Sequence, residues 1–121
     1  MIQYSVYPGG KKGAVTFSYD DGPENDKRLI ELFDKHGVKS TFHLNGWKYA
    51  GMDESGLAGI REIYKNHEIS CHTLSHGFPT DMPSQSLVYE IMKDREILEK
   101  IAGYPVVGMS YPFGSYNSFT A

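Results

Sequence analysis

The chain has 121 residues, a mass of 13.6 kDa and a formal net charge of −3, from 12 basic and 15 acidic residues. A chain of this length predicts one small domain, which we take to span residues 1–121. The mild acidity argues against a nucleic-acid partner, which would need a basic face. A single cysteine, Cys71, excludes both an intrachain disulfide and a zinc site built from several thiolates.

The sequence gives no sign of a membrane segment or a leader. No apolar run approaches the roughly 18 residues that a membrane span requires. Residues 1–7 do not show the basic segment followed by an apolar stretch that marks a signal peptide. We therefore expect either a cytoplasmic protein or a mature secreted or periplasmic form whose leader has been removed.

The first half of the chain predicts a strand, a helix and a second strand. Residues 13–19 are rich in β-branched and aromatic side chains, which is typical of a short buried strand. Apolar residues then recur at helical spacing after Asn25, the predicted N-cap, and Gly37 stands where this helix should end. Residues 38–44 predict the second strand.

The second half of the chain continues the same alternation. Apolar residues at three- and four-residue spacing predict helices over residues 53–64 and 84–101, the latter with Ser84 as its N-cap. Residues 67–71 predict a third strand between these helices, and residues 106–111 predict a fourth strand. The predicted order is therefore β-α-β-α-β-α-β.

This order predicts an α/β fold with a parallel sheet. Strands that are joined by crossover helices lie parallel, with right-handed winding. Four strands and three helices make about half of a closed (β/α) barrel, which typically takes roughly 200 residues or more. We therefore expect parallel β/α units that form the amino-terminal part of a barrel, either within a longer protein or in a homo-oligomer that covers the open sheet edges.

Polar side chains follow the predicted strands at their carboxyl ends, where parallel-sheet enzymes place their active sites. Asp20 and Asp21 follow the first strand, and His72 and His76 follow the third. Catalytic zinc takes three protein ligands and leaves one position open. Both histidines and one of the aspartates would fill that role, and the other aspartate would accept a proton from the attacking water.

Each of these residues also has an ordinary structural interpretation. Asp-Gly is a common turn dipeptide, so the aspartate pair alone indicates little more than a turn. His43 and His67 lie in or beside strands, which favours structural roles, and Cys71 is typical of a small buried side chain. Three aromatic residues fit either a sugar subsite or packing in the core: Trp47, Tyr49 and Phe78.

Four short segments stand in a fixed order: Ser-Tyr-Asp-Asp-Gly-Pro at 18–23, Ser-Thr-Phe-His-Leu-Asn-Gly at 40–46, His-Thr-Leu-Ser-His at 72–76 and Ser-Tyr-Pro-Phe-Gly at 110–114. The first, third and fourth are similar to Thr-Phe-Asp-Asp-Gly-Pro, His-Ser/Thr-x-x-His and Arg-x-Pro-Tyr/Phe-Gly. These are motifs of the polysaccharide deacetylases, the NodB-homology or carbohydrate esterase family 4 group. The second segment resembles that family's second strand, so the resemblance spans nearly the whole chain.

The resemblance implies a distorted (β/α) barrel of the polysaccharide deacetylase type. It also implies a metal-dependent hydrolase that removes acetyl groups from N-acetylated or O-acetylated glycans. In this family's pattern Asp20 would be the general base, and Asp21, His72 and His76 would hold Zn²⁺ or another divalent transition metal. The backbone N–H of Phe113 would stabilise the oxyanion.

Two features depart from the family pattern. Ser110 stands where the third motif carries the arginine that orients the base. The fourth and fifth motifs, including the Leu-x-His whose histidine acts as general acid, have no counterpart up to Ala121, so we expect the amino-terminal portion of a longer deacetylase. Two alternatives stay open: an inactive or binding module that keeps the barrel and metal site, and a related hydrolase of small non-peptide amides.

Overall fold

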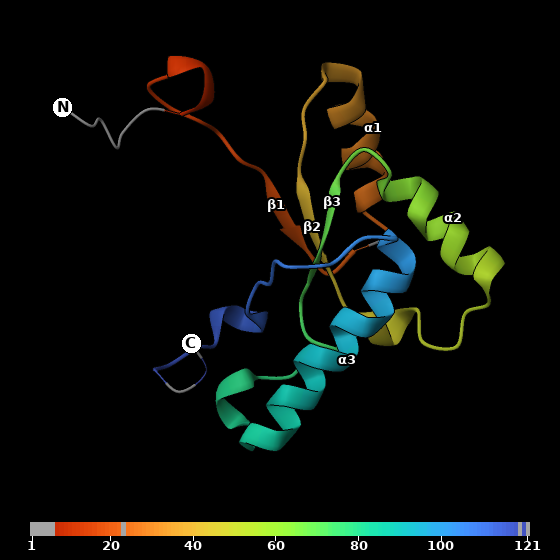
Figure 1. Cartoon of the computed structure of the whole chain (residues 1–121), viewed down its shortest axis with the longest axis vertical. Helices are drawn as coiled ribbons and strands as arrows, with labels where there is room; N and C mark the ends of the chain where they lie inside the picture. Colours follow the sequence, from red (N-terminus) through yellow and green to blue (C-terminus); the bar gives the residue numbers. More distant parts are fainter. Residues whose placement is uncertain (1–6, 23, 119, 121) are drawn as a thin grey trace.

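The centre of the computed structural model is a three-stranded parallel sheet in the order β1-β2-β3, with helices after each strand (Figure 1). The structure describes residues 7–22, 24–118 and 120. Pro23, which ends the first motif, and residues 1–6, where we expect no signal peptide, lie outside the described residues. The bounds are β1 Ser18–Asp20, α1 Asp26–His36, β2 Thr41–Leu44, α2 Glu54–Tyr64, β3 Glu68–Cys71 and α3 Ser84–Ala102.

The predicted α/β class is confirmed, and the core lies between the sheet and its helices. Phe42 and Leu44 of β2 have no exposed surface, and neither have Leu98 and Ile101 of α3. Burying each such side chain is worth about 1.5–3 kcal/mol. Figure 1 shows α1 and α2 to the right of the strands, while residues 7–17 run away to the left and are exposed.

The predicted first strand is too long. Only its last two residues, with Asp20, belong to β1, whose Ser18 pairs with Thr41 at the start of β2. Residues 13–17 have no partner strand because β2 begins only at Thr41. Val15, in the middle of this segment, is 82% exposed. The Phe17 carbonyl still accepts a 3.0 Å bond from the Thr41 N–H, but the high β-propensity of the residues before it does not make a strand.

The predicted fourth strand over residues 106–111 is wrong. Met109 forms only an isolated parallel bridge with Cys71, through a 3.0 Å bond from Cys71 N–H to the Gly108 carbonyl and another from Ser110 N–H to the Cys71 carbonyl. The ladder cannot continue past Pro112, which has no N–H to donate. This short bridge still places Ser110 beside the end of β3.

The predicted cap at Ser84 is wrong by one residue, whereas Asn25 and Gly37 stand at the predicted ends of α1. Asn25 occupies the N-cap position of α1, but its backbone angles are helical and its side chain makes no capping bond. Ser84 is already the first residue of α3, with Pro83 at the cap position. Gly37 ends α1 at φ 66°, a left-handed conformation that glycine adopts without strain. At α2, Asp53 accepts a capping bond from the Gly56 N–H.

Tyr49 belongs to the core, with 2% of its surface exposed, so it cannot line a sugar subsite. Trp47 and Phe78 are 55% and 48% exposed and remain on the surface. Cys71 is buried as predicted. Among the described residues, no helix combines the length and apolar character needed to span a membrane.

We expect Cys71 to react with iodoacetamide only when the chain unfolds. Its side chain is 3% exposed, and burial raises the pKa of its thiol to about 12, so almost no thiolate exists at about pH 8. Labelling measured by mass spectrometry across a urea series should follow the same transition as circular dichroism. Rapid labelling of the native chain would contradict this environment.

Candidate active site

The parallel register brings the ends of the three strands to one edge of the sheet. Asp20, the last residue of β1, is aligned with His43, and Leu44 at the end of β2 is aligned with Cys71 at the end of β3. The residues that follow the strands therefore emerge side by side. For β1 and β3 those residues are Asp21 and His72.

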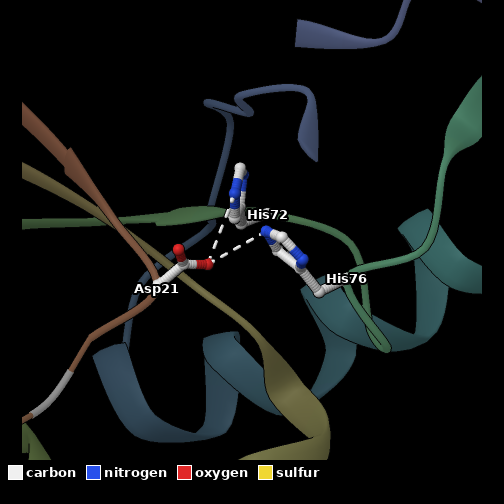
Figure 2. A group of neighbouring side chains, drawn as sticks. All are labelled: Asp21, His72 and His76. Carbon is white, nitrogen blue, oxygen red and sulfur yellow. Dashed lines mark ion pairs between the residues drawn. The ribbon is translucent and has the colours of Figure 1, made fainter. Parts of the chain in front are cut away.

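Asp21, His72 and His76 lie together as the sequence predicts (Figure 2), with one ligand atom from each within 4.8 Å of the others. Asp21 Oδ1 is 3.0 Å from His76 Nε2 and 3.7 Å from His72 Nε2. The His72 side chain is 2% exposed, whereas that of Asp21 is 59% exposed. One carboxylate oxygen and two imidazole nitrogens form a donor set that fits catalytic zinc.

Asp20 lies next to this cluster without belonging to it. Its Oδ2 is 3.9 Å from His72 Nε2, and its Oδ1 accepts a 3.0 Å hydrogen bond from the Ser110 hydroxyl. The Asp20 side chain is 45% exposed. The two neighbouring aspartates therefore differ in their contacts: Asp21 faces the Nε2 atoms of both histidines, while Asp20 faces only that of His72 and accepts a hydrogen bond from a hydroxyl.

The loops that carry the site hold residues in an unusual backbone conformation. The non-glycine residues that the structure describes with positive φ are Asp21 at 72°, Thr73 at 61°, His76 at 59° and Phe113 at 59°. Such a conformation costs roughly 1–3 kcal/mol for each residue and concentrates at functional sites. Two of these four residues, Asp21 directly after β1 and His76 in the loop after β3, carry side chains of the cluster.

Phe113 lies beside the cluster, as expected from its motif. Its ring packs edge-on against His76, with 4.6 Å between the ring centroids, and stacks on Phe78 at 4.0 Å. Both phenylalanines are largely exposed, at 60% and 48%. The site therefore has an aromatic rim on the His76 side.

His43 and His67 are buried and have structural contacts. His43 Nε2 is 2.7 Å from the Ser18 hydroxyl, its Nδ1 is 3.3 Å from the Cys71 carbonyl, and burial lowers its pKa. His67 Nδ1 accepts a 3.2 Å bond from the Ser40 N–H. Neither histidine belongs to the group of possible metal ligands that the described part of the chain contains.

Asp94, on α3, is a site residue that the sequence analysis missed. Its fully buried carboxylate accepts a 2.6 Å bond from the Gly46 N–H and a 3.0 Å bond from the His72 N–H. Burial raises its pKa to about 6. The available signal was its position seven residues after Leu87 on the apolar stripe of α3, where a carboxylate is found only if it is paired.

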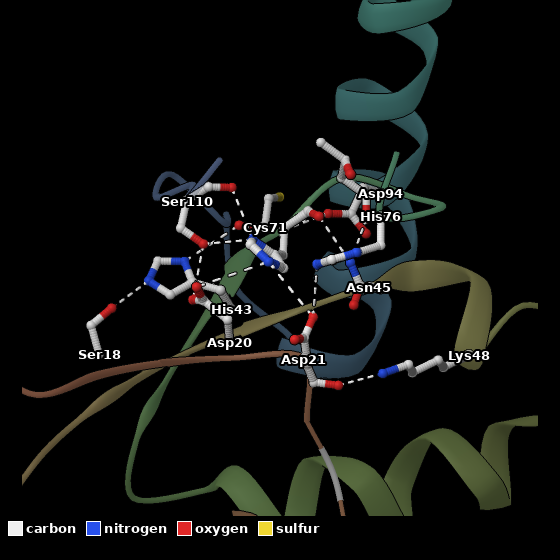
Figure 3. A network of polar contacts seen from close by, with 12 residues as sticks. Ser18, Asp20, Asp21, His43, Asn45, Lys48, Cys71, His76, Asp94 and Ser110 are labelled. Carbon is white, nitrogen blue, oxygen red and sulfur yellow. Dashed lines mark hydrogen bonds and ion pairs between the residues drawn. The ribbon is translucent and has the colours of Figure 1, made fainter. Parts of the chain in front are cut away.

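Asn45 completes the support of the β3 end. It is 1% exposed, and its Nδ2 donates a 2.8 Å bond to the His72 carbonyl and a 3.0 Å bond to the Thr73 carbonyl. His72 is thus held through its N–H by Asp94 and through its carbonyl by Asn45. Figure 3 labels Asp94 and Asn45, the two side chains that hold this backbone.

A family model described as polysaccharide deacetylase matches residues 8–121. The chain belongs to this family. It is 27% identical over 108 residues to a probable peptidoglycan-N-acetylglucosamine deacetylase of Arthroderma benhamiae, covering 88% of this chain and 25% of that protein. It is 30% identical over 109 residues to a chitin deacetylase of the same fungus, covering 87% of this chain and 29% of that protein.

A solved structure supports the family's fold for this chain. A peptidoglycan N-acetylglucosamine deacetylase in complex with 4-naphthalen-1-yl-N-oxidanyl-benzamide superposes with a TM-score of 0.75 at 27% identity, covering 87% of this chain and 49% of that one. The chain therefore spans about half of that structure, and about a quarter of the length of the two curated relatives. The fold is that of part of a carbohydrate esterase family 4 (β/α) barrel.

We expect Asp94→Ala to lower the free energy of unfolding by about 1–3 kcal/mol, because it leaves the buried Gly46 N–H without an acceptor and the His72 N–H with only the Leu44 carbonyl, 3.1 Å away. Asp94→Asn keeps one acceptor oxygen and should cost less. Urea unfolding followed by circular dichroism measures both losses. Gln85→Ala, at an exposed position of the same helix, is the control and should change stability little. Equal stability of Asp94→Ala and this control would contradict the assignment.

The same carboxylate makes stability depend on pH in a defined direction. Its pKa is about 6 in the folded chain against the usual 3.8, so folding favours the protonated form. That contribution is complete below about pH 4 and is lost as the pH rises through about 6. The stability of the wild type relative to Asp94→Asn should therefore fall over this interval in urea titrations. A constant difference would show that Asp94 does not titrate there.

Proposed function

We propose that this chain carries the metal site and the general base of a hydrolase that removes acetyl groups from N-acetylated, or O-acetylated, glycans. One observation carries the proposal: Asp21, His72 and His76 converge at the strand ends with Asp20 beside them. Membership of the polysaccharide deacetylase family and the activities for which its relatives are named support the choice of substrate.

Asp21, His72 and His76 would hold the metal, with Zn²⁺ the ion that suits their donor atoms best. The surroundings of His72 support this assignment. Its Nδ1 is 3.0 Å from the Ser110 carbonyl, which fixes the proton on that nitrogen and leaves Nε2 to act as ligand. When bound, such an ion lowers the pKa of a water molecule and polarises a carbonyl group.

Asp20 would act as general base. Its carboxylate is exposed enough to meet a substrate, and it faces the ligand cluster without being part of it. It would accept a proton from the water that attacks the acetyl carbonyl, and the protonated Asp20 would then be available to return that proton to the leaving amine.

The backbone N–H of Phe113 would stabilise the oxyanion that forms when water adds to the carbonyl. One such donor is commonly worth about 3–4 kcal/mol of transition-state stabilisation. The packing of the Phe113 ring on His76 supports the assignment, because it keeps this turn next to the proposed ligands.

A second candidate function is a module that binds the metal and the glycan without turnover. Ser110 favours it, since Asp20 receives a neutral hydrogen bond at the position where the family's third motif carries an arginine. The two functions differ in acetate release and agree in metal binding.

We expect His76→Ala and Asp21→Ala to weaken zinc binding at least tenfold, because each removes one of three ligands, while Asp20→Asn binds zinc almost as the wild type does. Competition with a chromophoric chelator measures these affinities. His36→Ala, an exposed histidine at the end of α1, is the control. Zinc binding by His76→Ala equal to that of the wild type would contradict the proposed site.

Acetate release from N-acetylated chitotetraose, assayed with zinc present, distinguishes a deacetylase from a binding module. A deacetylase should release acetate, and Asp20→Asn should reduce the rate by about 10²–10⁴-fold. Zinc binding without acetate release from any acetylated glycan would favour the binding module. Hydrolysis of a small ureide, with no action on glycans, would contradict the proposed substrate class.

A further inference from the structure

We propose that Ser110 is a positioning residue, whose single hydroxyl group joins the general base Asp20 to the metal ligand His72 (Figure 3). The inference rests on the function proposed above. It assigns a role to Ser110, which stands where the family's third motif carries an arginine.

The direction of the two hydrogen bonds follows from their chemistry. Ser110 Oγ is 3.0 Å from Asp20 Oδ1 and 2.6 Å from His72 Nδ1. A hydroxyl has one proton to donate, and an ionised carboxylate can only accept. Ser110 therefore donates to Asp20 and accepts from the Nδ1–H of His72. The chain of bonds runs from ring to hydroxyl to carboxylate.

This direction fixes the form of the His72 ring. With the proton on Nδ1, the lone pair lies on Nε2, which faces Asp21 Oδ1 at 3.7 Å and Asp20 Oδ2 at 3.9 Å. The Ser110 carbonyl, 3.0 Å from the same Nδ1, shares this proton. Ser110 thus contacts the ring twice, through its hydroxyl and through its backbone.

The backbone holds Ser110 in this position. Its N–H donates a 3.0 Å bond to the carbonyl of Cys71, the residue before His72. Met109 forms the bridge to β3 at the same point, and the buried Pro112 follows two residues later. The hydroxyl therefore stands at a fixed distance from the end of β3, so the two hydrogen bonds need little further ordering.

A serine at this position does something that an arginine cannot. A guanidinium group has only donors, so it could hold Asp20 but could accept nothing from His72. The hydroxyl does both, which couples the orientation of the base to that of the ligand. Removing it should therefore affect metal binding and the chemical step together, whereas Ser110→Arg should restore only the contact with Asp20.

The test compares Ser110→Ala, Ser110→Thr and Ser110→Arg, with Ser86→Ala, at an exposed position of α3, as the matched control. In the metal-free chain, ¹⁵N NMR of the His72 ring should show the proton on Nδ1 in the wild type. The Nδ1–H signal should shift in Ser110→Ala and Ser110→Arg, and stay in place in Ser110→Thr.

Zinc affinity should fall about tenfold in Ser110→Ala and Ser110→Arg, as it does when a residue that hydrogen-bonds a metal ligand is removed. Ser110→Thr keeps the hydroxyl and should bind zinc as the wild type does. For acetate release, Ser110→Ala should lower kcat by about tenfold or more with KM almost unchanged. Ser110→Arg should recover part of kcat without recovering zinc affinity.

A wild-type His72 ring protonated on Nε2 would overturn the proposal, and so would unchanged zinc affinity in folded Ser110→Ala. If Ser110→Ala does not fold, the wild-type ring spectrum and the contrast between Ser110→Thr and Ser110→Arg decide the question. If no variant or wild type releases acetate, the proposed function fails, but the NMR and zinc measurements still test the role of Ser110.

Discussion

The buried carboxylate of Asp94 is the contact on which the edge of this sheet depends. The strands of a parallel sheet are not joined at their carboxyl ends by short turns, so something else must fix how the chain leaves them. Asp94 reaches from α3 to the N–H of Gly46 after β2 and to the N–H of His72 after β3. Through Asp94, α3 thereby fixes the distance between the two segments that leave β2 and β3.

The two sides of the proposed site have different chemistry. On one side Asp20, Ser110 and His72 form a continuous chain of polar contacts. On the other, His76 packs against Phe113, which stacks on Phe78. A pyranose carrying an acetamido group has the same division, with polar atoms at its substituents and apolar C–H faces on its ring. The rim and the cluster together therefore support the proposed glycan substrate over a small polar amide.

The strand ends and the convergence of His72 and His76 with one of two aspartates could be predicted because alternation of strands and helices dictates a parallel sheet. The choice of Asp21 over Asp20 came from the resemblance to the family. The sequence could not reveal the hydrogen bonds of Ser110, since those depend on where a single bridge at Met109 places a segment 38 residues beyond His72. Asp94 escaped prediction for a related reason. Its partners are backbone N–H groups, which every residue except proline carries, so the sequence does not indicate which of them it binds.

The left-handed backbone lowers the stability of the fold at four residues, of which all but Thr73 belong to the proposed site: Asp21, Thr73, His76 and Phe113. Glycine would relieve the strain at each position, but it offers no carboxylate, no imidazole and no ring. Variants selected for thermal resistance alone should therefore accumulate glycine or asparagine in these loops and lose the site while the fold improves. Efforts to stabilise this domain should leave these four positions unchanged and seek their gains elsewhere.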